Sequence, residues 1–285
     1  MAKRKLYLVL DCETATLPCV AKYAKTEKSK QKISIAKPLI YDLGWKVIDR
    51  KGNIYKKRSF LITEIFSVPE VFNTAYYKEK RPKYLQKLRK NQITLVNWET
   101  AIKYLMEDMQ DVYAVGAYNA MFDFKKAIPF TELYIKNLYS ENMQDWLNYQ
   151  EKIVQEIIEG ERIESTKAFE EKLFRFRGEI FPLFDIWGIA CDKIINTDKY
   201  RKMCIDGGET TASGKYFKTS AEMAYRYIAN NTDFIESHTA LEDVEIECDI
   251  LLKALQKGAI PIGIIYFPFR ILGTVAEFEM KMERF

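Results

Sequence analysis

The segment that decides the fold is LYLVLDCET, residues Leu6–Thr14. Its first five residues form an uninterrupted apolar run, which predicts a strand buried on both faces. Because alternate residues of a strand share a face, Asp11 and Glu13 are expected to point the same way, with Cys12 opposite. Two such carboxylates repel by roughly 4 kcal/mol at ~4 Å and an effective dielectric near 20. A divalent cation would relieve that repulsion, whereas a strand ending at solvent would carry the same acids without a ligand.

The segments that follow predict an α/β architecture. Residues 39–48 and 53–62 read as strands that flank a turn-forming group at residues 49–52, so we expect a hairpin extending the same sheet. Apolar residues at helical spacing run from Trp98 to Met109, and a short strand follows at residues 112–117. This order predicts a mixed sheet with helices on both faces.

The second half of the sequence is expected to be richer in helices. Residues from Phe124 to about Phe181 are predicted to be mainly helical, followed by a strand at residues 183–187. Two later helices are predicted to begin with capping boxes at residues 219–222 and 239–242. The second of them carries a regular core-facing stripe, formed by Leu241, Val244, Cys248, Leu251 and Leu255.

Two further segments place chemically active side chains near predicted helix starts. Asn119 is a suitable N-cap, and Asp123 follows one turn later. The only histidine, His238, precedes the helix predicted from Thr239, and Asp243 lies one turn inside that helix. Acids near helix N-termini often serve only the helix dipole, so each segment alone fits a structural role. Imidazole, with an unperturbed pKa of ~6.5, is nevertheless the side chain best suited to accept a proton near neutral pH.

Together, these segments resemble the three motifs of the DEDDh branch of DnaQ-like 3′–5′ exonucleases. LDCET at residues 10–14 resembles the first motif, NAMFD at residues 119–123 the second, and HTALED at residues 238–243 the third. The third keeps the spacing of four residues between histidine and aspartate. The resemblance covers residues 5 to 256, and Thr14-Ala15-Thr16 departs from the Thr-Thr-Gly often found in the family.

The resemblance implies a fold, a site and a reaction. The fold would be ribonuclease H-like, in a domain of residues 1–258 with a helical insertion at about 124–181, followed by a tail of unassigned role at 259–285. Two Mg²⁺ or Mn²⁺ ions would be held by four carboxylates, those of Asp11, Glu13, Asp123 and Asp243. His238 would deprotonate the attacking water. The terminal nucleotide would contact Thr14, Leu17, Asn119 and Phe122. The products would be nucleoside 5′-monophosphates released from the 3′ end of a single strand, with DNA favoured.

Two other functions fit the same residues. One is a non-catalytic nucleic-acid-binding or polymerase-associated module, and the other is an RNA-specific exonuclease. The expected partners are the 3′ ends of single-stranded DNA or RNA, together with a polymerase or another replication or repair protein. The sequence does not distinguish proofreading from recycling or degradation.

Composition sets the remaining expectations for this chain of 285 residues. The formal net charge is only +4, but basic residues gather at residues 3–37 and 77–90, which can attract phosphate or simply be solvated. The five cysteines form no CxxC pair, as expected in a reducing compartment. The longest uncharged stretch, residues 259–269, is well short of the ~20 residues that cross a bilayer. We therefore expect a soluble, cytoplasmic protein with no membrane contact.

Overall fold

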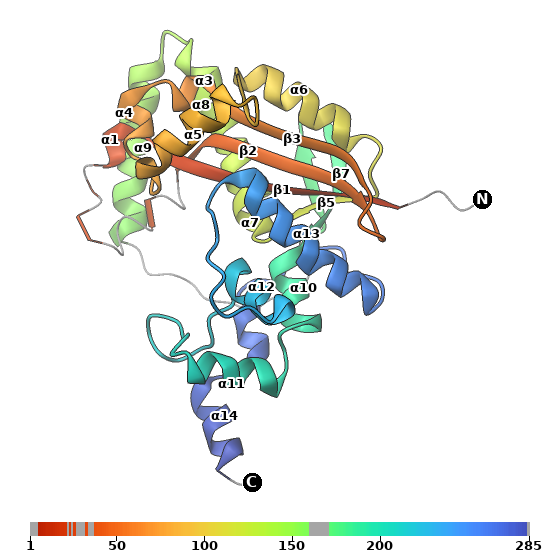
Figure 1. The fold of residues 1–285 in the computed structure, drawn as a ribbon. Coiled ribbons are helices and arrows are strands. Elements are labelled where there is room, and N and C mark those ends of the chain that lie inside the picture. Colours follow the sequence, from red (N-terminus) through yellow and green to blue (C-terminus); the bar gives the residue numbers. More distant parts are fainter. Residues whose placement is uncertain are drawn as a thin grey trace.

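Figure 1 shows the fold in a computed structural model, which describes residues 5–21, 23, 25–26, 32–33, 37–159 and 171–283. A mixed sheet of seven strands runs in the order β4-β3-β2-β1-β5-β7-β6. Its strands are β1 (Leu6–Thr16), β2 (Pro38–Asp49), β3 (Ile54–Ile62), β4 (Thr94–Val96), β5 (Ala114–Ala117), β6 (Leu173–Phe176) and β7 (Glu179–Asp185). β1 pairs antiparallel with β2 and parallel with β5, at the centre of the sheet. The predicted α/β class and mixed sheet are confirmed.

Helices cover both faces of the sheet (Figure 1). The upper layer in the figure contains α1 (Pro18–Ala21), α3 (Thr63–Phe66), α4 (Pro69–Phe72), α5 (Arg81–Arg89), α6 (Trp98–Met109), α8 (Ile128–Leu138) and α9 (Met143–Glu159). The lower face is covered by α10 (Ile186–Lys193), α12 (Ala221–Ala229) and α13 (Ala240–Gln256), with α11 (Asp198–Asp206) and α14 (Val275–Met282) below them. Short helical turns complete the order at η1 (Lys78–Lys80), α7 (Ala120–Phe122), η2 (Asp123–Ala127) and η3 (Pro268–Leu272).

Side chains of β1 divide between two hydrophobic cores. Leu8 and Leu10 belong to the core beneath the upper helices, whereas Tyr7 and Val9 belong to the core shared with α10 and α13. This alternation confirms that the strand is buried on both faces. By continuity, Asp11 and Glu13 lie on the face that α13 covers.

The N-terminus of α13 rests directly on the sheet because of a glycine. A Cβ at Gly44, which pairs with Asp11 across β2 and β1, would come within 2.6 Å of the backbone nitrogen of Leu241. The neighbouring Asp42 accepts a hydrogen bond from the backbone nitrogen of Ala240 at 2.9 Å. The absence of a side chain at Gly44 and the hydrogen bond to Asp42 therefore place the start of α13 against the end of β1.

Several predicted elements are confirmed. The hairpin is formed by β2 and β3, the helix at residues 98–109 is α6, and the strand predicted at residues 112–117 appears as β5. The strand predicted at residues 183–187 is β7, but it ends at Asp185, which is the N-cap residue of α10.

The helical prediction for residues 124–181 is wrong in its last part. Helix α9 ends at Glu159, residues 160–170 lie outside the described residues, and β6 and β7 then form a hairpin. In β6, Phe174 and Phe176 are buried while their neighbours are exposed, which is the period of a strand. Arg177 and Gly178, both with positive φ, make the tight turn. The division into a domain and a tail stays a prediction.

Both predicted capping boxes are corrected. Helix α12 is capped by Ser220 rather than Thr219, through a bond from the backbone nitrogen of Met223. Thr239 is the N-cap residue of α13, but its hydroxyl donates to Glu242 and accepts from Lys87, so it caps no backbone amide. Lys87 is distant from Thr239 in the sequence, so the local pattern does not show that it reaches this hydroxyl.

The C-terminal segment packs onto the main body of the chain. The backbone nitrogen of Gly263 donates to the carbonyl of Leu183 at 2.7 Å, and Tyr216 forms a β-bridge with Thr274. Thr274 and Glu277 form a true capping box at the start of α14. In the part of the chain that is described, no helix is long and apolar enough to span a bilayer.

Candidate metal centre

The three sequence segments meet at one cavity of about 550 Å³. Its wall contains the acids expected from the sequence, Asp11, Glu13, Asp123 and Asp243, and also His238. Asp11 and Glu13 come from β1, Asp123 from the start of η2, and Asp243 from the first turn of α13. Residues more than 200 positions apart in sequence are thus brought together as the motif order predicted.

Hydrogen bonds fix the second segment beside the first. The thiol of Cys12 donates to Oδ1 of Asp123 at 3.0 Å, which ties η2 to β1. Asp185, at the end of β7, accepts from the backbone nitrogens of Ala120 at 3.3 Å and Gly188 at 3.0 Å. One buried carboxylate thereby holds the starts of both α7 and α10. Asn119 precedes α7 as predicted, but its side chain makes no capping bond.

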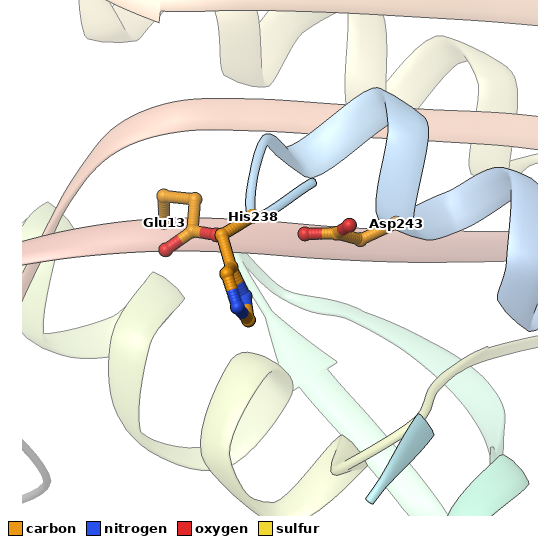
Figure 2. A group of neighbouring side chains, drawn as sticks. All are labelled: Glu13, His238 and Asp243. Atoms are coloured by element: carbon orange, nitrogen blue, oxygen red, sulfur yellow. The ribbon is translucent and has the colours of Figure 1, made fainter. Parts of the chain in front are cut away.

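Figure 2 shows how three of these side chains lie relative to one another. Glu13 projects from β1, His238 from the loop before α13, and Asp243 from the helix with its carboxylate directed toward the other two. One potential ligand atom from each of the three lies within 4.8 Å of the others. Such spacing allows a single cation to contact more than one of them.

The acids carry more negative charge than their surroundings balance. Burial raises the pKa of Asp123 to about 7. Burial, followed by repulsion from Glu236 and Asp42, raises the pKa of Asp243 to about 8. The pKa values of Asp11 and Glu13 are also raised well above their usual range, first by burial and then by neighbouring carboxylates.

This electrostatic environment fits a divalent cation. Among the described residues, none of the four predicted acids forms an ion pair. The available donors are carboxylate oxygens with one imidazole, and Mg²⁺ and Mn²⁺ prefer such oxygen ligands. A cation held there would offset the repulsion that otherwise keeps the carboxyl groups protonated.

His238 adopts an unusual backbone conformation. Its φ is +48°, in the left-handed region that few non-glycine residues occupy, so the surrounding loop must hold it there. The imidazole stacks on Tyr77 with ring centroids 4.2 Å apart and an angle of 12° between the planes. Burial, and then the nearby positive charge of Lys80, lower the pKa of His238. The neutral form, which can accept a proton, is therefore favoured at neutral pH.

Sequence reasoning missed three acids near the cavity. Glu247 lines it, is only 2% exposed and accepts from the backbone nitrogen of Tyr118 at 3.2 Å. Glu236 also lines the cavity, and Asp42 of β2 pairs with Glu13 of β1. Glu247 could have been found, because it follows Asp243 by one helical turn and so shares its face. The sequence indicates Asp42 less strongly, because its only distinctive feature there is that it is an acid within an apolar strand.

The predicted substrate contacts divide into two groups. Asn119 and Phe122 line the cavity. Thr14 is outside its lining, and Leu17 is 0% exposed within the upper hydrophobic core. Leu17 is therefore corrected to a core residue in this conformation, because the β-bulge after Glu13 and the turn into α1 carry the chain away from the cavity.

Comparisons with known proteins add little to this geometry. No sequence family and no curated protein matches the chain. Among solved structures, the chain is similar to the crystal structure of cell-death related nuclease 4 (CRN-4), with a TM-score of 0.36 and 10% identity over 91% of this chain and 67% of that one.

Three lysines of the basic segment at residues 77–90 hold the loop that carries His238. The Nζ atom of Lys80 donates to the carbonyl of Ser237 at 2.6 Å. Lys83 and Lys87 contact the two carboxylate oxygens of Glu242 at 2.7 and 2.8 Å, and Lys87 also donates to Thr239. These lysines brace the third motif, whereas nucleic-acid contact by the other basic residues stays a prediction.

Replacing both Lys83 and Lys87 with methionine is expected to loosen this loop. Partly exposed ion pairs contribute about 0.2–1 kcal/mol each, so loss of both should accelerate amide exchange at residues 237–242 by about twofold to thirtyfold. Hydrogen-exchange mass spectrometry of the folded protein measures this change. Lys90→Met, at the end of the same helix and exposed, is the matched control. Equal exchange in the double variant and the control would show that the lysines do not hold the loop.

Proposed function

We propose that this protein is a metal-dependent 3′–5′ exonuclease acting on single-stranded nucleic acid, with DNA favoured. The observation that carries the proposal is the meeting of Asp11, Glu13, Asp123, Asp243 and His238 in one cavity. Their order along the chain resembles the DEDDh motifs, and the 3′–5′ direction rests on that resemblance. The excess of buried carboxylates supports a requirement for cations.

Divalent cations bound by these acids would supply positive charge at the scissile phosphate and make water more acidic. The four carboxylates would hold the cations in place, each with its charge offset by the ions rather than by a proton. Because the pKa values of Asp123 and Asp243 lie at about 7 and about 8 without metal, cation binding is expected to release protons at neutral pH.

His238 would accept the proton of the attacking water on an imidazole nitrogen. Its lowered pKa keeps it neutral and ready to do so at neutral pH. Nδ1 lies 3.8 Å from Oε2 of Glu236, which can stabilise the imidazolium once it forms. Tyr77, stacked on the ring, would keep the imidazole over the acids.

The polarity of cleavage tests the proposal. Single-stranded DNA and RNA of the same sequence, each labelled at the 5′ or at the 3′ end, are incubated with Mg²⁺, Mn²⁺ or a chelator. We expect a ladder of shortening products from the 5′-labelled strand and immediate release of a labelled mononucleotide from the 3′-labelled strand, with cations only. The ratio of the DNA and RNA rates gives the sugar preference.

Two results would contradict the proposal. Cleavage that persists in chelator would remove the role of the acids as metal ligands. Salt-sensitive binding of both strands without cleavage would favour a non-catalytic nucleic-acid-binding module.

A further inference from the structure

Part of the cavity wall is aromatic and comes from outside the three motif segments. Trp187, at the start of α10, and Phe269, in η3 of the C-terminal segment, both line the cavity. Their rings lie 28° from parallel with centroids 6.2 Å apart. Both side chains are half-buried rather than packed fully into the core. The segment after residue 258, to which the sequence assigned no role, thus contributes to the candidate active site.

Hydrogen bonds hold the indole ring of Trp187 in place. Its Nε1 donates to Oγ1 of Thr219 at 2.8 Å, and its backbone nitrogen donates to the carbonyl of Tyr118 at 3.0 Å. The hydroxyl of Tyr118 in turn donates to the carbonyl of Thr219 at 2.7 Å. This network ties the indole to the segment that leads into Asp123. The polar edge of the ring is satisfied within the protein, so what it offers the cavity is apolar surface.

Phe269 is held just as firmly. Its ring meets Tyr216 edge-on, with centroids 5.0 Å apart. The segment that carries it is anchored on one side by the bond from Gly263 to Leu183 and on the other by Arg201, which donates from Nε to the carbonyl of Leu272 at 2.9 Å. The segment anchored in this way presents a phenyl ring to a cavity that is also lined by six carboxylates.

We propose that Trp187 and Phe269 form a base-stacking surface for a nucleotide near the 3′ end of the substrate, an inference that rests on the proposed function. A strand whose phosphate reaches the acids must place its bases against the same cavity wall. Flat aromatic rings are the groups that bind bases of any sequence, because every base has an apolar π-face. A volume of about 550 Å³ is also within the range of small-molecule sites and can hold a nucleotide.

Substrates that lack one base test the stacking surface directly. Single abasic sites are placed at the first, second or third position from the 3′ end of a single-stranded DNA. Initial cleavage rates give kcat/KM for wild type and for Phe269→Ala, Phe269→Leu and Phe269→Tyr. Met280→Ala, an exposed residue of α14 in the same C-terminal segment, is the matched control.

One abasic position is expected to lower kcat/KM of wild type about tenfold, the usual size of one base-aromatic stack. Phe269→Ala should show a loss of similar size on intact DNA, mainly in KM, and no further loss at that abasic position. Tyrosine should restore the wild-type pattern and leucine should not, because leucine keeps apolar bulk without a flat ring. Met280→Ala should behave as wild type.

The proposal is overturned if the abasic site and the Phe269→Ala substitution lower kcat/KM independently of each other. If the abasic penalty is the same in wild type and Phe269→Ala at all three positions, the base does not contact this ring. If wild type cleaves no strand, the proposed function fails, and dissociation constants of the same strands then decide the inference. It stands if the abasic penalty on binding disappears in Phe269→Ala and falls if the penalty is equal in both proteins.

Discussion

Replacing His238 with alanine is expected to lower kcat on single-stranded DNA about 10²- to 10⁴-fold, the usual contribution of one positioned acid-base side chain. KM is expected to change little, because the imidazole is assigned to proton transfer rather than to substrate binding. Steady-state rates at saturating Mn²⁺ measure both constants. Ile235→Ala, in the same loop but 76% exposed and outside the cavity, is the control and should keep wild-type rates.

The pH dependence gives this prediction a second readout. Because burial and Lys80 lower the pKa of His238, the rising limb of the kcat profile should lie at or below pH ~6.5. The chain has one histidine, so a single imidazole NMR signal reports its pKa directly. Full activity in His238→Ala, or a profile unrelated to that titration, would remove the histidine from the mechanism.

Divalent cations are expected to raise the melting temperature, and more so at pH 8 than at pH 5.5. In the metal-free protein the pKa values of Asp123 and Asp243 are about 7 and about 8, whereas both are near 3.8 in the unfolded chain. The folded state therefore keeps protons that the unfolded state has released, and stability falls as pH rises from about 4 to about 8. A cation at 100 times its Kd adds about 2.7 kcal/mol, or roughly 5–10 °C in a chain of this size.

Asp243→Asn separates the charge of this carboxylate from its shape. Without metal, the variant should melt like wild type only near pH 4; it should already melt higher at pH 5.5, where unfolded wild type has released this proton, and higher still relative to wild type at pH 8. Its cation-induced rise should be smaller than that of wild type. Asp249→Asn, on the exposed side of the same helix, should leave the cation-induced rise unchanged. An identical cation response in Asp243→Asn and wild type would show that the ions bind elsewhere.

The elements that local pattern dictates were predictable from the sequence. A continuous apolar run and a turn-forming tetrad are enough to indicate β1 and the β2–β3 hairpin, and a 3.6-residue period indicates α6. The β6–β7 hairpin was missed because Leu173 and Phe176 are spaced as on one face of a helix, whereas the strand buries Phe174 and Phe176. Its two-residue turn, with positive φ at Arg177, carries no strong signal in the sequence.

The candidate site was predictable in its motifs but not in its surroundings. The order of acids and histidine identifies which residues meet, because that order is a property of the chain. The contacts that hold them are properties of the fold. They join segments up to about 200 residues apart, which no local pattern reveals. Examples are the contact of Gly44 with α13, the ion pairs of the lysines with Glu242, and the aromatic side of the cavity at Phe269.

Product analysis with and without cations tests the central claim most directly. Wild type and Asp123→Asn are incubated with single-stranded DNA in Mn²⁺ or chelator, and the released nucleotides are separated by chromatography. The account predicts nucleoside 5′-monophosphates, released one at a time from the 3′ end by wild type with Mn²⁺, and at least a hundredfold less from Asp123→Asn. Nucleotide release by wild type in chelator, or equal release by both proteins, would contradict it.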